Sequence, residues 1–201
     1  MKSLSLSLLV ALMFAGLASA GPIIDFQDGF VQINNGDETY GYDFTVAGSG
    51  ISVTGLGVFE SFALPLAGSH AVGLWDASGS LLASATIGGA DTVVASTDAL
   101  GQWREALIAP VFLGAGQYFA GVFYTIESEN VLVVATPLSV AGITYGSARY
   151  AFDNSLTFPG NAFGTTLVGP AVFADAAVPE PATISLLGLG LAGVAFLRRR
   201  K

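Results

Sequence analysis

Residues Ser69–Ile87 read SHAVGLWDASGSLLASATI, which is two strand-like runs separated by a turn. Within His70–Trp75 the even-numbered residues fall on one face and the odd-numbered residues on the other, because successive side chains of a β-strand alternate. Residues 76–80 have the Asp, Ser and Gly content of a tight turn, and residues 81–87 form a second apolar run. The stretch therefore predicts a β-hairpin whose small residues let a neighbour press close.

Similar runs rich in Val, Phe, Thr and Tyr lie on both sides of this hairpin, separated by clusters of Gly, Asn, Asp and Ser. No stretch shows sustained helical periodicity with caps. The pattern predicts an all-β domain, an antiparallel β-sandwich that is jelly-roll-like with eight to ten strands. The expected strands are Thr39–Val46, Ile51–Glu60, Ala71–Asp76, Ser80–Ile87, Trp103–Ala109, Gln117–Thr125, Val131–Thr136, Ile143–Tyr150 and Phe163–Val172.

The first twenty residues have the layout of a secretory signal peptide. Lys2 precedes an apolar run of about 14 residues, which is short for a membrane-spanning helix of roughly 20 residues. Ala18 and Ala20 are the small residues that precede a cleavage site, so signal peptidase is expected to release a chain that begins at Gly21. The alternative is an uncleaved N-terminal membrane helix.

The other end of the chain combines a proline box, an apolar run and a basic cluster. The uncharged run Ala182–Leu197 would form a helix of about 24 Å, a marginal membrane span against a hydrocarbon core of about 30 Å. The basic cluster is expected to remain cytoplasmic, which places the preceding chain across the membrane. The box is Val178-Pro179-Glu180-Pro181 and the cluster is Arg198-Arg199-Arg200-Lys201.

This tail resembles the PEP-CTERM sorting signal of Gram-negative bacteria. The resemblance implies that exosortase recognises Pro179, Glu180 and Pro181 and that the helix is then removed. The alternative is a plain membrane anchor with a proline cap. The chain then divides into a signal peptide (1–20), an extracellular β-sandwich domain (21–177) and the sorting signal (178–201).

A second resemblance covers roughly Tyr40 to Tyr124. The sequences LGVF at 56–59, HAVGLWD at 70–76 and GSLLASAT at 79–86 are similar to an uncharacterised domain that occurs upstream of PEP-CTERM tails and in some secreted glycan-related proteins. These residues are strand and turn formers, so the resemblance concerns the fold. It implies no established activity.

Charge excludes one class of partner. Residues 21–177 hold two arginines and no lysine against fourteen carboxylates, a formal net charge of −12. Nucleic acid is therefore not expected as a partner, because phosphate binding needs clustered Lys and Arg. The chain has no cysteine, which rules out disulfides and Cys-ligated metals.

The sequence offers few groups for catalysis. His70, the single histidine, lies in an alternating strand with no nucleophile motif near it, so we expect a packed or edge-strand residue. Paired carboxylates of a glycoside hydrolase would have to come from a set that nothing in the sequence pairs across a cleft. That set is Asp25, Asp28, Asp37, Glu38, Glu127 and Glu129.

Calcium and sugars are the two ligands that the residue types favour most. Asn35, Asp37 and Glu38 at one turn and Asp153 at another are weak candidate Ca²⁺ ligands, with solvated turn residues as the alternative. Trp75 and Trp103 could present aromatic faces to a glycan, with core packing as the alternative.

We therefore expect a non-enzymatic structural or adhesive module that is exported as an inner-membrane-anchored precursor and then reaches the cell surface or extracellular matrix. Exopolysaccharide or biofilm is the setting that the first resemblance implies. A carbohydrate-binding module is the alternative, and a glycan-active hydrolase is a more remote one.

Overall fold

The part of the chain that the structure describes consists of fourteen antiparallel β-strands and their connections. The computed structural model describes residues 21–33, 37–66, 68–125, 131–164 and 166–175, and within these ranges there is no helix. The strands are β1 (Gly21–Pro22), β2 (Ile24–Ile33), β3 (Glu38–Val46), β4 (Ile51–Ser61), β5 (Ser69–Asp76), β6 (Leu81–Gly88), β7 (Thr92–Ala95), β8 (Gly101–Leu113), β9 (Gly116–Tyr124), β10 (Val131–Ser139), β11 (Ile143–Phe152), β12 (Asn161–Phe163), β13 (Leu167–Val168) and β14 (Pro170–Ala174).

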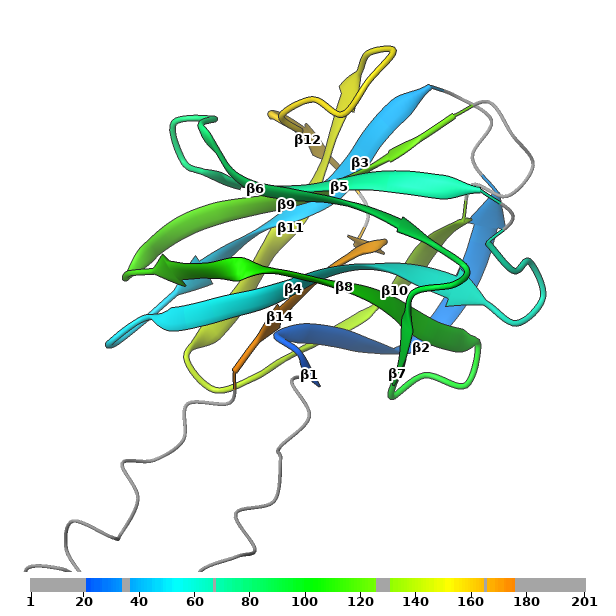
Figure 1. The fold of residues 1–201 in the computed structure, drawn as a ribbon, viewed down its shortest axis with the longest axis horizontal. Helices are drawn as coiled ribbons and strands as arrows, with labels where there is room; N and C mark the ends of the chain where they lie inside the picture. Colours follow the sequence, from blue (N-terminus) through cyan, green and yellow to red (C-terminus); the bar gives the residue numbers. More distant parts are fainter. Residues whose placement is uncertain (1–20, 34–36, 67, 126–130, 165, 176–201) are drawn as a thin grey trace, which may run out of the picture.

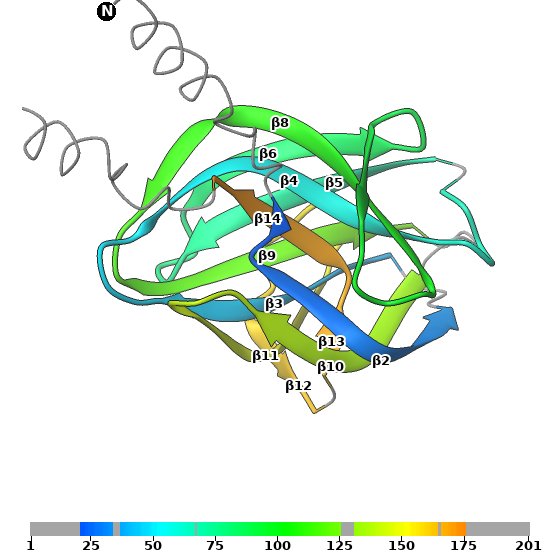
Figure 2. The ribbon, with the colours of Figure 1, turned by 90° about the horizontal axis from the view of Figure 1, so that it is seen from below.

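The strands form three sheets. The six-stranded sheet has the order β12-β11-β3-β9-β5-β6 and lies over the five-stranded sheet, β1-β14-β4-β8-β7 (Figure 1). A three-stranded sheet, β13-β10-β2, completes the body, and Figure 2 shows β2 and β10 side by side. The all-β class and the antiparallel β-sandwich predicted from the sequence are confirmed.

Strand β4 is covered on both of its faces. Every residue from Gly55 to Ser61 is buried, although alternate side chains point in opposite directions. On one face Phe59 contacts Phe26 of β2 and Trp103 of β8, with ring centroids 4.9 and 5.3 Å away. The other face includes Val58, which is also fully buried. A continuous apolar sequence, rather than a strict alternation, is what such a strand requires.

The hairpin expected at residues 69–87 forms as the sequence predicts. β5 pairs with β6 from Ser69↔Gly88 to Trp75↔Leu81, with one register shift beside Trp75. The Asp76 carboxylate accepts hydrogen bonds from the backbone N–H groups of Ser78 and Ser80 (2.8 and 3.0 Å), which closes the turn.

Other predicted strands needed correction. The expected strand Phe163–Val172 is three shorter strands, β12, β13 and β14, and β8 continues past Ala109 to Leu113. Strands β2 and β7 were not expected from the sequence. The polar residues and glycine of β2 interrupt the apolar pattern of a strand. The structure accommodates them with a bulge opposite β10, where Asp28 has φ = 54°.

The two ends of the folded domain lie side by side. β1 pairs with β14 through Gly21↔Ala174 and Pro22↔Phe173. Within the described residues no helix is long and apolar enough to cross a membrane. The membrane helix expected at 182–197 lies outside the described residues.

Candidate functional site

The signals at the two ends of the chain lie largely outside the described residues. Ala18 and Ala20 precede them, and Pro179, Glu180, Pro181 and the basic cluster 198–201 follow them. Gly21, the expected first residue after signal cleavage, is the first residue of β1 and is exposed. A chain that begins at Gly21 would therefore retain every residue of β1.

The two tryptophans are core residues in this structure. Trp103 is fully buried, and its Nε1 donates a 3.0 Å hydrogen bond to Asp25. Trp75 is 4% exposed and lies against Gly73 and Phe158. Neither ring presents a face to solvent, so the expectation that they contact glycan is wrong for this structure. The sequence could not settle the question because the outer face of β5 is covered by a segment more than eighty residues away.

His70 is a packed residue, as its place in an alternating strand predicts. It is 4% exposed, and its ring lies against Tyr124 with centroids 5.2 Å apart. Its Nδ1 lies 3.4 Å from the carbonyl oxygen of Phe123 on the adjacent strand β9. This arrangement holds the imidazole within the apolar interior.

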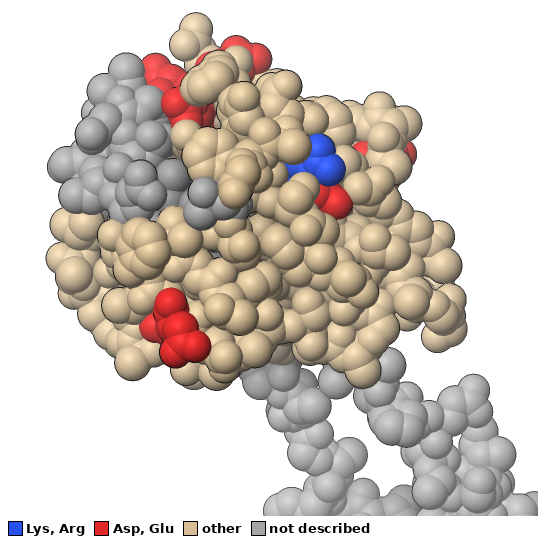
Figure 3. All heavy atoms as spheres, turned by 180° about the vertical axis from the view of Figure 1, so that it is seen from behind, with Lys and Arg blue, Asp and Glu red and all other residues tan. Residues whose placement is uncertain are grey.

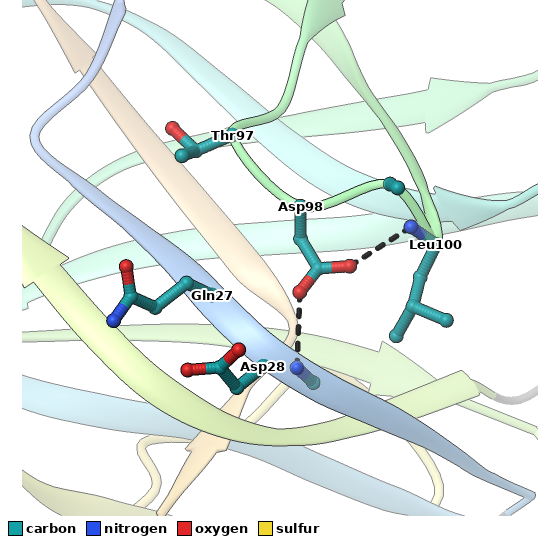
Figure 4. Close-up of a pocket in the computed structure, with 7 residues that line it drawn as sticks. Gln27, Asp28, Thr97, Asp98 and Leu100 are labelled. Atoms are coloured by element: carbon teal, nitrogen blue, oxygen red, sulfur yellow. Dashed lines mark hydrogen bonds between the residues drawn. The ribbon is translucent and has the colours of Figure 1, made fainter.

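An open cleft of about 430 Å³ lies between β2 and the loop that precedes β8 (Figure 4). Asp28 and Asp98 contribute its two carboxylates, and a pair of carboxylates is what a glycoside hydrolase requires. However, Asp98 accepts hydrogen bonds from the backbone N–H groups of Gly29 and Leu100 at 2.9 and 2.8 Å, as Figure 4 shows. Asp98 therefore has a structural task, which is to fix this loop to β2.

Asp25 fixes the same loop from its other end. Its carboxylate accepts hydrogen bonds from the hydroxyl of Ser96, from the hydroxyl and N–H of Thr97, and from Trp103, all between 2.7 and 3.0 Å. From the sequence alone, Asp25 is only one candidate acid among several. The cluster Ser96-Thr97-Asp98 was the available signal, because these residue types bind backbone groups at turns.

A buried ion pair lies on the outer face of the six-stranded sheet. The Nε of Arg149 on β11 is 2.7 Å from Asp43 on β3, and Gln117 and Ser147 also donate to this carboxylate. Burial alone would raise the pKa of Asp43, but these hydrogen bonds and the positive charge of Arg149 outweigh it and lower that pKa. A Cβ at Gly146 would collide with the carboxylate, so glycine makes the arrangement possible.

A second ion pair joins β4 to β8. Nη2 of Arg104 lies 2.7 Å from Oε2 of Glu60, and Gln102 donates to the same oxygen at 2.6 Å. The N–H of Leu66 donates to the other oxygen of Glu60. Burial opposes ionisation here as well, yet the pKa of Glu60 is lowered because Arg104 and Gln102 bind its charged form.

These pairs use both arginines of the described part of the chain. Arg104 and Arg149 are its only Lys or Arg residues, and each is bound to a carboxylate of the same domain. Figure 3 shows the result on one face, where the surface is mostly neither acidic nor basic and a blue area borders a red one. A cluster of unpaired cations, which binding of phosphate or nucleic acid requires, is therefore lacking among the described residues.

The candidate calcium ligands do not form a metal cage in the described residues. No group of three or more His, Asp or Glu side chains is close enough there to hold an ion. Asn35 lies outside the described residues. Asp153 accepts hydrogen bonds from the N–H of Asn154 and the hydroxyl of Thr157, which is the role of a turn residue. Glu38 is the first residue of β3 and is paired in register with Phe152, and Asp37 directly precedes this strand.

Glu105 is a buried carboxylate of a different kind. It is 7% exposed, its Oε1 has no hydrogen-bond partner among the described residues, and burial raises its pKa above the ordinary value. It lies against Gly55, where a Cβ would collide with the carboxylate. Because the folded state binds this proton more tightly than the unfolded state, this group makes the protein less stable as pH rises above about 4.5.

Replacing Glu105 with Gln is therefore expected to increase the free energy of unfolding at pH 7 by about 1 kcal/mol, since a buried charge is removed. Urea unfolding of both proteins between pH 4 and pH 7 measures this effect. The gain should shrink toward pH 4, where the Glu105 carboxyl is protonated. Asp175→Asn is the exposed control, and a Glu105→Gln protein that is less stable at pH 7 would contradict the assignment.

Comparison with known proteins identifies one region of the chain. Residues 177–201 match the PEP-CTERM protein-sorting motif. No curated protein and no solved structure matches the chain. The matched region begins two residues after Asp175, where the described sandwich ends. The chain thus carries a PEP-CTERM protein-sorting motif directly after an antiparallel β-sandwich domain.

Proposed function

We propose that this chain is an exported protein that exosortase processes, and that its β-sandwich is a non-enzymatic structural or adhesive module of the cell surface or extracellular matrix. The observation that carries the proposal is the sorting motif at 177–201, which implies a membrane-anchored precursor that is handled by exosortase. Exopolysaccharide or biofilm is the setting that the resemblance of this tail implies.

The chemistry of the described domain supports a structural role. Its buried acids at Asp43 and Glu60 are bound to arginines, and Asp25 and Asp98 bind backbone and side-chain donors of one loop. A domain of this kind uses its polar groups to hold strands and loops together. Its remaining charge is acidic, which favours solubility outside the cell.

The experiment is mass spectrometry of both ends of the protein recovered from its native host. For the wild-type protein we expect the mature chain to start at Gly21 and to lack the C-terminal segment that holds Ala182–Lys201. Glu180→Ala should abolish removal of that segment, because the resemblance makes Glu180 part of the box that exosortase reads.

The matched control is Glu105→Ala, which removes a carboxylate from the sandwich and leaves the box intact. Its C-terminal segment should still be removed. Normal maturation of the Glu180→Ala protein would refute recognition of the box. If the wild-type protein keeps its basic cluster at 198–201, the tail serves only as a membrane anchor.

A further inference from the structure

We infer that the end of the sandwich at which its two termini meet is a lipid-contacting surface that rests on the bilayer while the chain is anchored. This inference rests on the proposed function in one respect, namely that the sorting segment holds the precursor in a membrane. The lipid surface is recognised through apolar contact rather than through charge.

Three turns gather around the termini at this end. The N–H of Asp175 donates to the carbonyl of Ser52 at 3.1 Å, directly after the turn that joins β3 to β4. The N–H of Val140 donates to the carbonyl of Ile23 at 3.0 Å, which brings the β10–β11 turn beside β1. The β8–β9 turn belongs to the same end, because Leu113 pairs with Ile51.

These turns and the strand ends that lead into them carry no charged residue. Residues 46–52, 107–116 and 136–144 contain no Asp, Glu, Lys or Arg, and neither do residues 21–23. Asp175 is the acid that follows at the domain end. In contrast, the opposite end of β3 starts with Glu38, which Asp37 directly precedes. These are opposite ends because Val46 pairs with Gly116 and Glu38 with Tyr124, the two ends of β9. The turns at this edge of the acidic domain are thus uncharged, and its charged groups are Asp175 and, after signal cleavage, the amino group of Gly21.

Apolar side chains are exposed at the same edge. Phe112 is 69% exposed, although it lies beside the termini through its pairing with Ser52. Val140 is 48% exposed and lines a largely apolar cleft of about 330 Å³ with Ile23 and Ile51, and Asp175 is the acid at this cleft. Exposed apolar groups on uncharged turns are suited to the interfacial region of a bilayer.

The short connection to the sorting segment supports the same orientation. Seven residue steps separate Asp175 from Ala182, where the uncharged run begins, so the connecting chain spans at most about 25 Å. The edge that holds Gly21 and Ala174 must therefore stay near the bilayer while this run is inserted. Attraction to anionic lipid headgroups cannot supply the contact, because both arginines of the domain are paired internally.

The test uses the full chain, which has no cysteine, so that a single introduced cysteine can carry an environment-sensitive fluorophore. The two labelled proteins are Phe112→Cys and Phe152→Cys. These phenylalanines are matched, because both are 69% exposed and Phe152 lies at the opposite end, paired with Glu38. Each protein is reconstituted into phosphatidylcholine vesicles that contain spin-labelled lipid as a quencher.

We expect a blue-shifted emission and loss of fluorescence for the label at position 112, and neither change at position 152. Equal quenching of the two labels in proteins that float with the vesicles would overturn the inference and leave the proposed function intact. Failure of the chain to float would refute both the inference and the anchoring that the proposed function assumes. A label at 112 that is protected only in native membranes containing exosortase would assign this surface to a protein and overturn the lipid contact.

Discussion

Trp103→Ala should lower the free energy of unfolding by about 3–5 kcal/mol, the range for removal of a large aromatic side chain from a packed core. Trp103 is fully buried between Phe26 and Phe59, with ring centroids 5.7 and 5.3 Å away. The three rings come from β8, β2 and β4, so the cavity would open where the five-stranded and three-stranded sheets meet. Urea unfolding of the purified protein measures the loss.

Two further variants separate the contributions at this site. Trp103→Phe keeps an aromatic ring but loses the hydrogen bond from Nε1 to Asp25, so we expect an intermediate loss. Leu107→Ala is the control on the same strand, because Leu107 is 79% exposed and should change stability by less than about 0.5 kcal/mol. A Trp103→Ala protein that is as stable as the Leu107→Ala protein would contradict the core position of this ring.

Arg149→Met should destabilise the protein by about 2–4 kcal/mol, near the range of about 3–5 kcal/mol for breaking a buried ion pair. The substitution leaves Asp43 charged although only 7% of its side chain is exposed. The arginine also lies over the ring of Phe119, with its Cζ 5.2 Å from the ring centre. Methionine retains part of this apolar contact, so the loss reports mainly on the unpaired carboxylate.

The pH dependence of this variant provides a check that packing alone would not give. In the wild type, the lowered pKa of Asp43 means that this group's contribution to stability is lost as pH falls through its titration range. In Arg149→Met the Asp43 carboxyl can take up a proton and become neutral, so the deficit should shrink on acidification. Asp43→Asn in the same variant should recover part of the stability at pH 7. A deficit that stays constant with pH would contradict the charge-based explanation.

The local sequence pattern was sufficient to predict the strands in which apolar and polar residues recur regularly. The hairpin β5–β6 followed from alternation and from the turn at 76–80, and its register agrees with that reading. β2 was missed because its Asp25, Gln27, Asp28 and Gly29 interrupt the apolar pattern, and a bulge accommodates them. Local pattern is therefore weakest where a strand is held by polar side chains.

The functional features likewise fall into those that could be predicted from the sequence and those that could not. A sorting motif depends on the order of residues within one short segment, so the tail at 177–201 could be identified without any knowledge of the fold. Pairs of side chains that are distant in sequence could not be identified without the fold. Asp25 and Trp103 are 78 residues apart, and Asp43 and Arg149 are 106 apart.

The strand period, the acidic charge, the absence of cysteine and the sorting motif can be obtained from the amino-acid sequence alone, because each is a property of composition or of neighbouring residues. Which faces are covered, and which edge holds both termini, depends on contacts between distant segments and is seen only in the folded structure. Alternation shows that Trp75 and His70 point to opposite faces of β5, yet both are buried, since one faces the core and the other lies under Phe158. The pairing of Gly21 with Ala174 likewise depends on strand contacts between segments more than 150 residues apart, which no local pattern encodes.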